Sequence, residues 1–232
     1  NRNISCQTCH HPSFGSSDGL PLPIGEGGQG IGNQRTVSTG SIIPRNTPHV
    51  VNLGFPEFNK MFWDGRVSFN LETKIFITPE KNLNSEHEKG KKYINVLTSA
   101  LAAQAMFPPL SHEEMRGAKG TNEIADATDN FSAWEKIVDR ILNKEIYQNL
   151  FRQTFPNTAL ENINFAHIGE ALAFYQGQRF AVTDTPFDRY IKGDINALTN
   201  KQKRGMAIFY THGKCVQCHS GMQFTDQLFH NV

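Results

Sequence analysis

All four cysteines of this chain fall into two copies of one pattern, Cys-x-x-Cys-His, with one copy near each end. The residues of the two copies are Cys6, Cys9, His10, Cys215, Cys218 and His219. Two thiols at this spacing can each add to one vinyl group of a haem, and the adjoining histidine can then ligate the iron. The spacing therefore predicts two covalent c-type haems, with the two histidines as iron ligands.

Two other chemistries use the same cysteine spacing. Zinc sites also pair such units, but usually about 15 to 20 residues apart, whereas these lie at opposite ends of the chain and each precedes a histidine. A thioredoxin-like redox pair needs a βαβ context, which the sequence lacks. Haem attachment is therefore favoured, and because bacteria attach such haems outside the cytosol, we expect a periplasmic protein.

The overall composition narrows the remaining classes of function. The chain has 232 residues with a formal net charge of +1, and its charged residues form no long runs of one sign. We therefore expect no nucleic-acid partner. Apolar residues are numerous enough for a packed core, but no window approaches the length of a membrane span. The sequence thus predicts a globular protein without a transmembrane segment.

Apolar periodicity predicts a mainly α protein with long loops. Residues 11–60 are rich in Gly, Pro, Ser and Asn and are expected to wrap around a cofactor. Within them, residues 25–30 match G-x-G-x-x-G, but Pro21 and Pro23 argue against the strand that a nucleotide site requires. We expect these glycines to let the backbone pass close to a flat ligand. Capping boxes at Ser85, Ser132 and Thr199, together with apolar stripes, predict helices over residues 85–107, 132–141, 165–177 and 199–213.

Four short segments carry a family resemblance. They are Arg45-Asn46-Thr47-Pro48, Phe62-Trp63-Asp64-Gly65-Arg66, Pro186-Phe187-Asp188-Arg189 and Cys218-His219-Ser220-Gly221. In this order, around two Cys-x-x-Cys-His motifs, they closely resemble the bacterial di-haem cytochrome c peroxidases, including the MauG-type enzymes. The resemblance implies two cytochrome-c-like domains, each holding one covalent haem. We expect a peroxidatic haem domain at residues 1–180 and an electron-transfer haem domain at residues 181–232.

In that family a Gln, a Pro at +4, a Glu at +10 and a Met at +11 mark the open face of the peroxidatic haem. Only Gln104, Pro108, Glu114 and Met115 fit every offset, which implies an insertion near residues 67–100. The resemblance thus assigns Gln104 and Glu114 as the catalytic pair. The alternative is that both are solvated polar residues beside a helix end.

The chemistry of peroxide cleavage gives an independent reason to single out Glu114. Heterolysis of H₂O₂ moves one proton from one oxygen to the other, and a carboxylate can carry both transfers if burial raises its pKa toward neutrality. A neutral amide such as that of Gln104 can orient the peroxide without adding charge. His112, two residues before Glu114, is interpreted as a surface or supporting residue.

The resemblance also implies roles for Trp63 and Asn46. Trp63 would lie between the two haems and pass electrons, and its alternative role is that of a large core residue. Asn46 matches a position whose side chain binds a structural Ca²⁺. Calcium prefers several oxygen ligands, and the sequence has no acidic cluster beside Asn46, so backbone carbonyls and water would supply the others. The alternative is a turn-forming Asn before Thr47-Pro48.

The sequence therefore predicts a di-haem c-type peroxidase. It would reduce H₂O₂ to water at the first haem and receive electrons at the second from a small soluble cytochrome c or cupredoxin. A MauG-type enzyme that oxidises Trp or Tyr of a partner protein, and a non-catalytic di-haem electron carrier, are the alternatives. The resemblance leaves a homodimer open.

Two features bear on the iron ligands. The family often blocks the peroxidatic iron with a histidine from the glycine-rich loop, but residues 15–45 contain none. We therefore expect the oxidised first haem to be five-coordinate or water-bound, as in MauG-type enzymes. Because only a short segment follows His219, we expect the second haem's distal ligand beyond Val232.

Overall fold

Most of the regular structure is helical in the computed structural model, which describes residues 3–84 and 86–231. The α-helices are α1 (Cys6–Cys9), α2 (Glu88–Ile94), α3 (Ala100–Gln104), α4 (Asn130–Leu142), α5 (Glu145–Thr154), α6 (Phe165–Arg179), α7 (Pro186–Ile191) and α8 (Asn200–Tyr210). Short 3₁₀ turns are η1 (Pro12–Phe14), η2 (Gly32–Gln34), η3 (Pro108–Leu110), η5 (Leu160–Asn162) and η6 (Cys215–Gln217), and η4 (His112–Arg116) is a π-helical turn. The prediction of a mainly α protein is confirmed, and none of the described helices is long and apolar enough to cross a membrane.

The core forms where α6 packs against α3 and α4. Alanines make up most of α3, and a Cβ on Gly169 of α6 would lie 2.7 Å from the Ala102 carbonyl oxygen. The two helices can therefore approach this closely only because position 169 lacks a side chain. Trp134 of α4 and Phe165 of α6 stack beside this crossing with almost no exposure to solvent.

A small antiparallel sheet covers the other side of α3. Its strands β1 (Lys60–Met61), β2 (Val67–Phe69) and β3 (Phe76–Ile77) pair in the order β1-β2-β3. Met61 faces Val67, and Phe69 faces Phe76 with its ring stacked at 4.3 Å between centroids. Alternation puts Val67 and Phe69 into the core. The turn between β1 and β2 carries the segment Phe62–Arg66, so the sheet fixes its place.

The prediction of one helix over residues 85–107 is wrong. The chain forms two helices there, α2 and α3, with a break between them. The backbone N–H and hydroxyl of Thr98 donate to the carboxylate of Glu170 at 2.6 and 2.8 Å, and Ser99 caps α3 by accepting from Ala102 N. These contacts stop α2 and start α3 anew. The proposed cap Ser85 lies outside the described residues.

The other helix boundaries shift or hold according to their caps. Helix α4 starts at Asn130, not Ser132, because the Asp129 carboxylate accepts from Ser132 N at 2.9 Å. Helix α6 continues past Gly177 to Arg179. The box at Thr199 is confirmed, but α8 ends at Tyr210, not Gly213. Helices α5 and α7 were not expected from the sequence.

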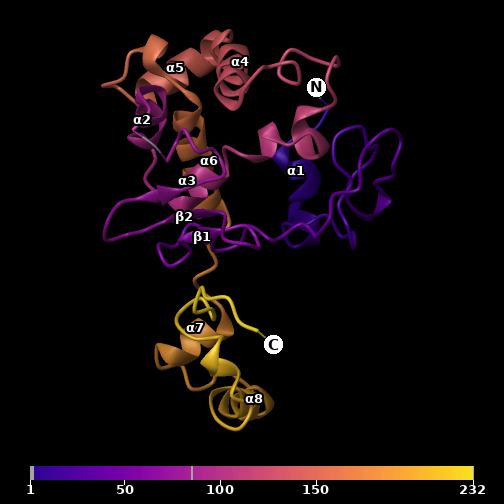
Figure 1. Cartoon of the computed structure of the whole chain (residues 1–232). Helices are drawn as coiled ribbons and strands as arrows, with labels where there is room; N and C mark the ends of the chain where they lie inside the picture. The colour runs from indigo at the N-terminus through magenta and orange to yellow at the C-terminus, as the bar shows by residue number, and fades with distance from the viewer. Residues whose placement is uncertain (1–2, 85, 232) are drawn as a thin grey trace.

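Figure 1 shows α7, α8 and the C-terminal segment set apart from the other elements and joined to them by an extended stretch after α6. The C-terminal segment returns to the β1–β2 region, where the Lys60 Nζ donates to the Gln227 carbonyl oxygen at 2.8 Å. A Cβ on Gly65 would lie 2.8 Å from the Phe229 ring. A division into two haem domains at residues 180 and 181 stays a prediction.

Candidate functional site

The first Cys-x-x-Cys-His motif forms a single helical turn, α1, with His10 at its C-cap. Both cysteines are free thiols. The His10 Nδ1 lies 3.2 Å from the Ser16 carbonyl oxygen, and burial lowers the pKa of His10. Such a bond fixes the ring and leaves Nε2 of a neutral imidazole for a metal.

The second motif repeats this arrangement. Cys215 lies at the start of η6, both cysteines are free, and the His219 Nδ1 lies 3.1 Å from the Phe224 carbonyl oxygen. Two thiols on one turn, followed by an imidazole held through Nδ1, is the donor set of a c-type haem, so both motifs fit that group. No group of three or more His, Cys, Asp or Glu residues suited to a metal ion forms within the described ranges.

Glu114 lies on the π-helical turn η4, which begins after Ser111. The Ser111 hydroxyl accepts from Glu114 N at 3.2 Å and so caps the turn. Glu114 lines a cavity of about 270 Å³ together with Phe62, Arg66 and Phe107. Burial raises the pKa of Glu114, while the Arg66 guanidinium acts in the opposite direction. A half-buried carboxyl with a raised pKa can both accept and donate a proton more readily than an exposed one.

The Glu114 carboxyl acts electrostatically on the first motif. The pKa of the Cys9 thiol is raised to about 11, chiefly by burial and then by the negative charge of Asp18, with Arg35 opposing and Glu114 adding to the rise. Asp18 is fully buried, and its Oδ2 is the one enclosed side-chain oxygen or nitrogen in the described ranges without a hydrogen-bond partner. Glu114 therefore lies near enough to α1 to act on the Cys9 thiol.

The glycine-rich loop holds the turn that carries Glu114. The Glu26 backbone N–H donates to the Glu113 carbonyl oxygen at 3.0 Å, and a Cβ on Gly25 would lie only 1.7 Å from that oxygen. The expectation that these glycines approach a flat ligand is therefore wrong for Gly25, which approaches protein backbone. The other glycines of this run whose neighbours the structure gives also lie against protein atoms.

Arg35 organises this loop, and the sequence analysis did not identify it as a functional residue. Its guanidinium donates to the carbonyl oxygens of Ile24, Gly25 and Gly30 at 2.7, 2.6 and 2.9 Å, and it is 5% exposed. The sequence signal that could have identified Arg35 is a lone arginine inside a polar, glycine-rich stretch. The carbonyl groups of such irregular backbone need hydrogen-bond donors, which an arginine supplies.

Gln104 and His112 lie on either side of η3. Gln104 ends α3 and is half-buried, but it is not among the described residues that line the cavity with Glu114. The Nδ1 of His112 contacts the Gly117 carbonyl oxygen across η4. His112 thus supports the turn, and the role of Gln104 stays a prediction.

Trp63 is not a core residue, because its side chain is 63% exposed. The Arg45 guanidinium lies 3.5 Å from the Trp63 ring centroid, and Arg66 lies 3.8 Å from the Phe62 ring centroid. Arg66 also pairs with both carboxylate oxygens of Asp64, at 3.0 and 3.1 Å. The β1–β2 turn therefore presents an indole at the surface with one arginine, Arg45, stacked over it.

Asn46 serves as a loop tether. Its side-chain nitrogen donates to the carbonyl oxygens of Leu20 and Pro21 at 2.6 and 3.3 Å. Its Oδ1 could ligate calcium, but one amide oxygen does not make a calcium site. We derive no step from calcium.

Known proteins are similar to this chain over nearly its whole length. MauG from Methylorubrum extorquens is 29% identical over 99% of this chain and 47% of its own length. The cytochrome c551 peroxidase of Pseudomonas aeruginosa is 26% identical over 97% of this chain and 47% of its own length. The chain thus spans about half the length of the curated relatives it matches.

The crystal structure of a MauG-like protein associated with microbial copper homeostasis superposes with a TM-score of 0.60. It is 24% identical, and the match covers 98% of this chain and 49% of that one, so this likeness concerns the fold. The family model for di-haem cytochrome c peroxidases matches residues 1–196. Since that match covers most of the sequence, the chain belongs to the di-haem cytochrome c peroxidase family.

Proposed function

We propose that this chain is the haem-bearing part of a periplasmic di-haem peroxidase that reduces H₂O₂ to water. The observation that carries the proposal is a half-buried carboxyl with a raised pKa, Glu114, in the same electrostatic environment as the first of two Cys-x-x-Cys-His motifs. Each motif histidine is held through Nδ1 by a backbone carbonyl. In this proposal Cys6, Cys9 and His10 bind the peroxidatic haem c.

The bound haems supply the two electrons that peroxide reduction consumes. Glu114 accepts a proton from one oxygen of H₂O₂ and returns it to the other, so that the oxygen that leaves does so as water. Arg66, which lines the same cavity and acts on the Glu114 pKa, stabilises the carboxylate form that accepts the first proton and that is restored after the second transfer. Gln104, at the end of α3, is proposed to orient the peroxide from the other side.

Electrons are proposed to enter through the second haem, bound by Cys215, Cys218 and His219 in residues 181–232, and to pass through Trp63. The contacts of Gln227 and Phe229 with the β1–β2 turn support this route, because they bring the C-terminal segment to the turn that carries Trp63. The donor is proposed to be a small soluble cytochrome c or cupredoxin.

Calcium at Asn46 and a homodimer also belong to the proposal as implied by the family. The Asn46 Oδ1 is compatible with calcium as one ligand among several. Metal analysis of the purified di-haem protein, before and after dialysis against a calcium chelator, tests the first. Sedimentation of the same samples tests the second.

Steady-state turnover of H₂O₂ with reduced cytochrome c tests the proposed function. Fast oxidation of cytochrome c supports it, and inertness toward peroxide would show a plain electron carrier. Peroxide consumption without cytochrome oxidation would favour a MauG-type enzyme, an alternative supported by the absence of histidine from residues 15–45. The oxidised first haem should then give a high-spin ferric signal in electron paramagnetic resonance.

A further inference from the structure

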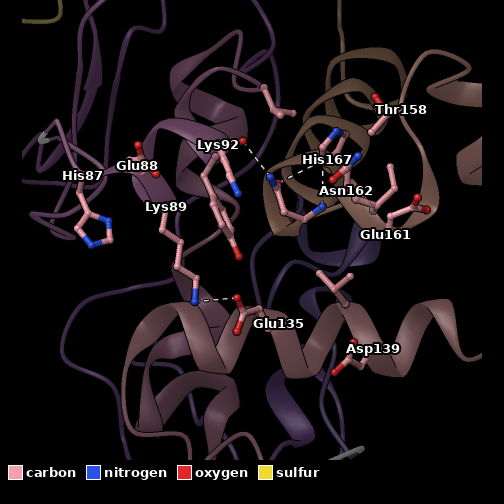
Figure 2. Close-up of a pocket in the computed structure, with 15 residues that line it drawn as sticks. His87, Glu88, Lys89, Lys92, Glu135, Asp139, Thr158, Glu161, Asn162 and His167 are labelled. Atoms are coloured by element: carbon pink, nitrogen blue, oxygen red, sulfur yellow. Dashed lines mark hydrogen bonds and ion pairs between the residues drawn. The ribbon is translucent and has the colours of Figure 1, made fainter.

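A second and larger cavity lies away from both haem motifs. It is an open cleft of about 970 Å³ between α2, α4 and the start of α6, within the size range of small-molecule sites. Figure 2 shows Lys89 of α2 reaching across it to Glu135 of α4, and their ion pair measures 2.7 Å. The proposed peroxide reaction does not use this cleft.

Tyr93 gives the cleft a reactive group. Its ring belongs to the core and only 3% of the side chain is exposed, yet Tyr93 lines the cleft. No hydrogen bond joins the Tyr93 hydroxyl to any residue that the structure describes. The hydroxyl is also not enclosed, because Asp18 Oδ2 is the only enclosed side-chain oxygen or nitrogen without a hydrogen-bond partner among the described residues. The hydroxyl must therefore open onto the cleft, since a buried tyrosine normally finds a partner.

His167 places a hydrogen-bond donor in the same cleft. The Asn164 backbone N–H donates to the His167 Nδ1 at 3.1 Å, so the proton of the neutral ring is on Nε2. His167 is 4% exposed and lines the cleft, and Figure 2 shows it at the start of α6. The cleft therefore combines one phenol and one imidazole N–H, both almost wholly buried.

Aromatic rings connect Tyr93 to the cavity that contains Glu114. Tyr93 and Trp134 lie 5.6 Å apart between ring centroids, and Trp134 and Phe107 lie 6.1 Å apart. Phe107 lines the cavity with Glu114. Trp134 is fully buried, and its Nε1 donates to the Met106 carbonyl oxygen at 2.8 Å, which fixes the indole between the two cavities.

Tyrosine and tryptophan are the protein side chains that a strong oxidant converts most readily to radicals. In this chain Trp134 lies between Tyr93 and the cavity that contains Glu114. Neighbouring rings at these separations allow an electron to pass from Tyr93 through Trp134 toward the peroxide cavity. A phenylalanine at position 93 would pack equally well in the apolar cluster. Only a redox or hydrogen-bonding role uses the extra hydroxyl.

We propose that Tyr93 and Trp134 form an electron-transfer branch by which H₂O₂ oxidises small neutral phenols in the cleft. This rests on the proposed peroxide reaction at the first haem. Tyr93 loses one electron through Trp134 and releases its hydroxyl proton to water in the cleft. A phenol then gives a hydrogen atom to the Tyr93 oxygen, which breaks the O–H bond of the phenol and restores Tyr93. Two phenols and one H₂O₂ thus give two phenoxyl radicals and two waters.

The charges around the cleft disfavour an anionic ligand. Lys89 and Glu135 pair with each other, and the remaining charged side chains of the lining are Lys92 and the carboxylates of Glu88, Asp139 and Glu161. The cleft therefore carries more negative than positive charge, which favours a neutral phenol over a phenolate. The His167 N–H can donate to a phenol oxygen, which leaves the phenol's O–H directed at the Tyr93 hydroxyl.

Rapid-freeze electron paramagnetic resonance on the di-haem protein tests the branch. After H₂O₂ is added without an electron donor, we expect a tyrosyl signal that narrows when the tyrosines are ring-deuterated. Tyr93→Phe should abolish it. Tyr175→Phe is the matched control, because Tyr175 on α6 is 54% exposed and does not line the cleft, and it should leave the signal unchanged.

Oxidation of p-cresol by H₂O₂ gives the second readout. Tyr93→Phe should lose this oxidation while peroxide-dependent oxidation of reduced cytochrome c continues at the rate of the unchanged protein. A radical that survives in Tyr93→Phe, or p-cresol oxidation that does not depend on Tyr93, overturns the branch and leaves the proposed function intact. A di-haem protein that does not react with H₂O₂ overturns both.

Discussion

Gly25 controls the position of Glu114, and its replacement by alanine gives a direct measure of that control. The added Cβ would lie 1.7 Å from the Glu113 carbonyl oxygen, whereas real Cβ contacts are essentially never shorter than 3.0 Å. The loop and the η4 turn must therefore separate by more than 1 Å. The backbone at Gly25 is not left-handed, so the effect of Gly25→Ala comes from this contact.

The separation has two consequences of calculable size. Overpacking costs about 1–3 kcal/mol, and loss of the hydrogen bond from Glu26 N to the Glu113 oxygen adds about 1 kcal/mol. We expect the free energy of unfolding to fall by about 2–4 kcal/mol. Because a displacement of about 1 Å can cost about 100-fold in rate, kcat/KM for H₂O₂ should fall by about that factor.

Chemical denaturation and stopped-flow reaction with H₂O₂ measure the two effects in the di-haem protein. Gly205→Ala is the matched control, because Gly205 lies within α8 and an added Cβ would meet nothing within 4 Å. That variant should gain about 0.4–1 kcal/mol and keep its rate. If Gly25→Ala behaves like Gly205→Ala, the glycine-rich loop does not position the Glu114 turn and our argument fails.

Three further predictions concern the same region. Glu114→Gln should lower the rate of reaction with H₂O₂ by about 10²–10⁴-fold in stopped-flow measurements, while Glu113→Gln, which keeps its backbone carbonyl, should react normally. Because burial raises the pKa of Glu114, kcat/KM for H₂O₂ should decline on the acid side at a pH above the ordinary pKa of glutamate, and a pH–rate profile of Glu114→Gln should lack that decline. The same raised pKa means that the folded state holds this proton more tightly than the unfolded state. The contribution of Glu114 to the free energy of unfolding is therefore complete below its unfolded-state pKa and is lost as pH rises through its folded-state pKa. Chemical denaturation of the unchanged protein and of Glu114→Gln across this pH range measures that loss. Arg35→Ala should lower the free energy of unfolding by about 3–5 kcal/mol, since two buried carbonyls and one partly buried carbonyl lose a charged donor. Arg204→Ala on the exposed face of α8 should change it little.

A local sequence signal predicted the start of one helix correctly. The Thr199 box fixed the start of α8 because Thr199 and Gln202 lie three residues apart and bond to each other without help from the rest of the chain. The break between α2 and α3 could not be predicted in this way. It depends on Glu170, which reaches Thr98 only after the chain has folded, and local propensity yields to such tertiary contacts.

The candidate site likewise has parts that local sequence predicts and parts that depend on tertiary contacts. The two haem motifs are contiguous in sequence, so their chemistry could be inferred from spacing alone. The support of Glu114 depends on the approach of the loop around Gly25, far earlier in the chain. Glycine-rich composition indicated a close approach, but not whether a ligand or protein backbone would be approached. Only the folded structure distinguishes the two.

The β1–β2 turn holds Trp63 in place at a cost in backbone strain. Phe62 has a φ of +64°, a conformation that is unfavourable for a bulky residue. The Arg66 guanidinium over its ring and the paired bonds from Arg66 to Asp64 offset that cost. Strain that the surroundings maintain in this way often marks a functional site. The strained turn thus presents the Trp63 indole at the surface and brings Gly65 against the Phe229 ring of the C-terminal segment.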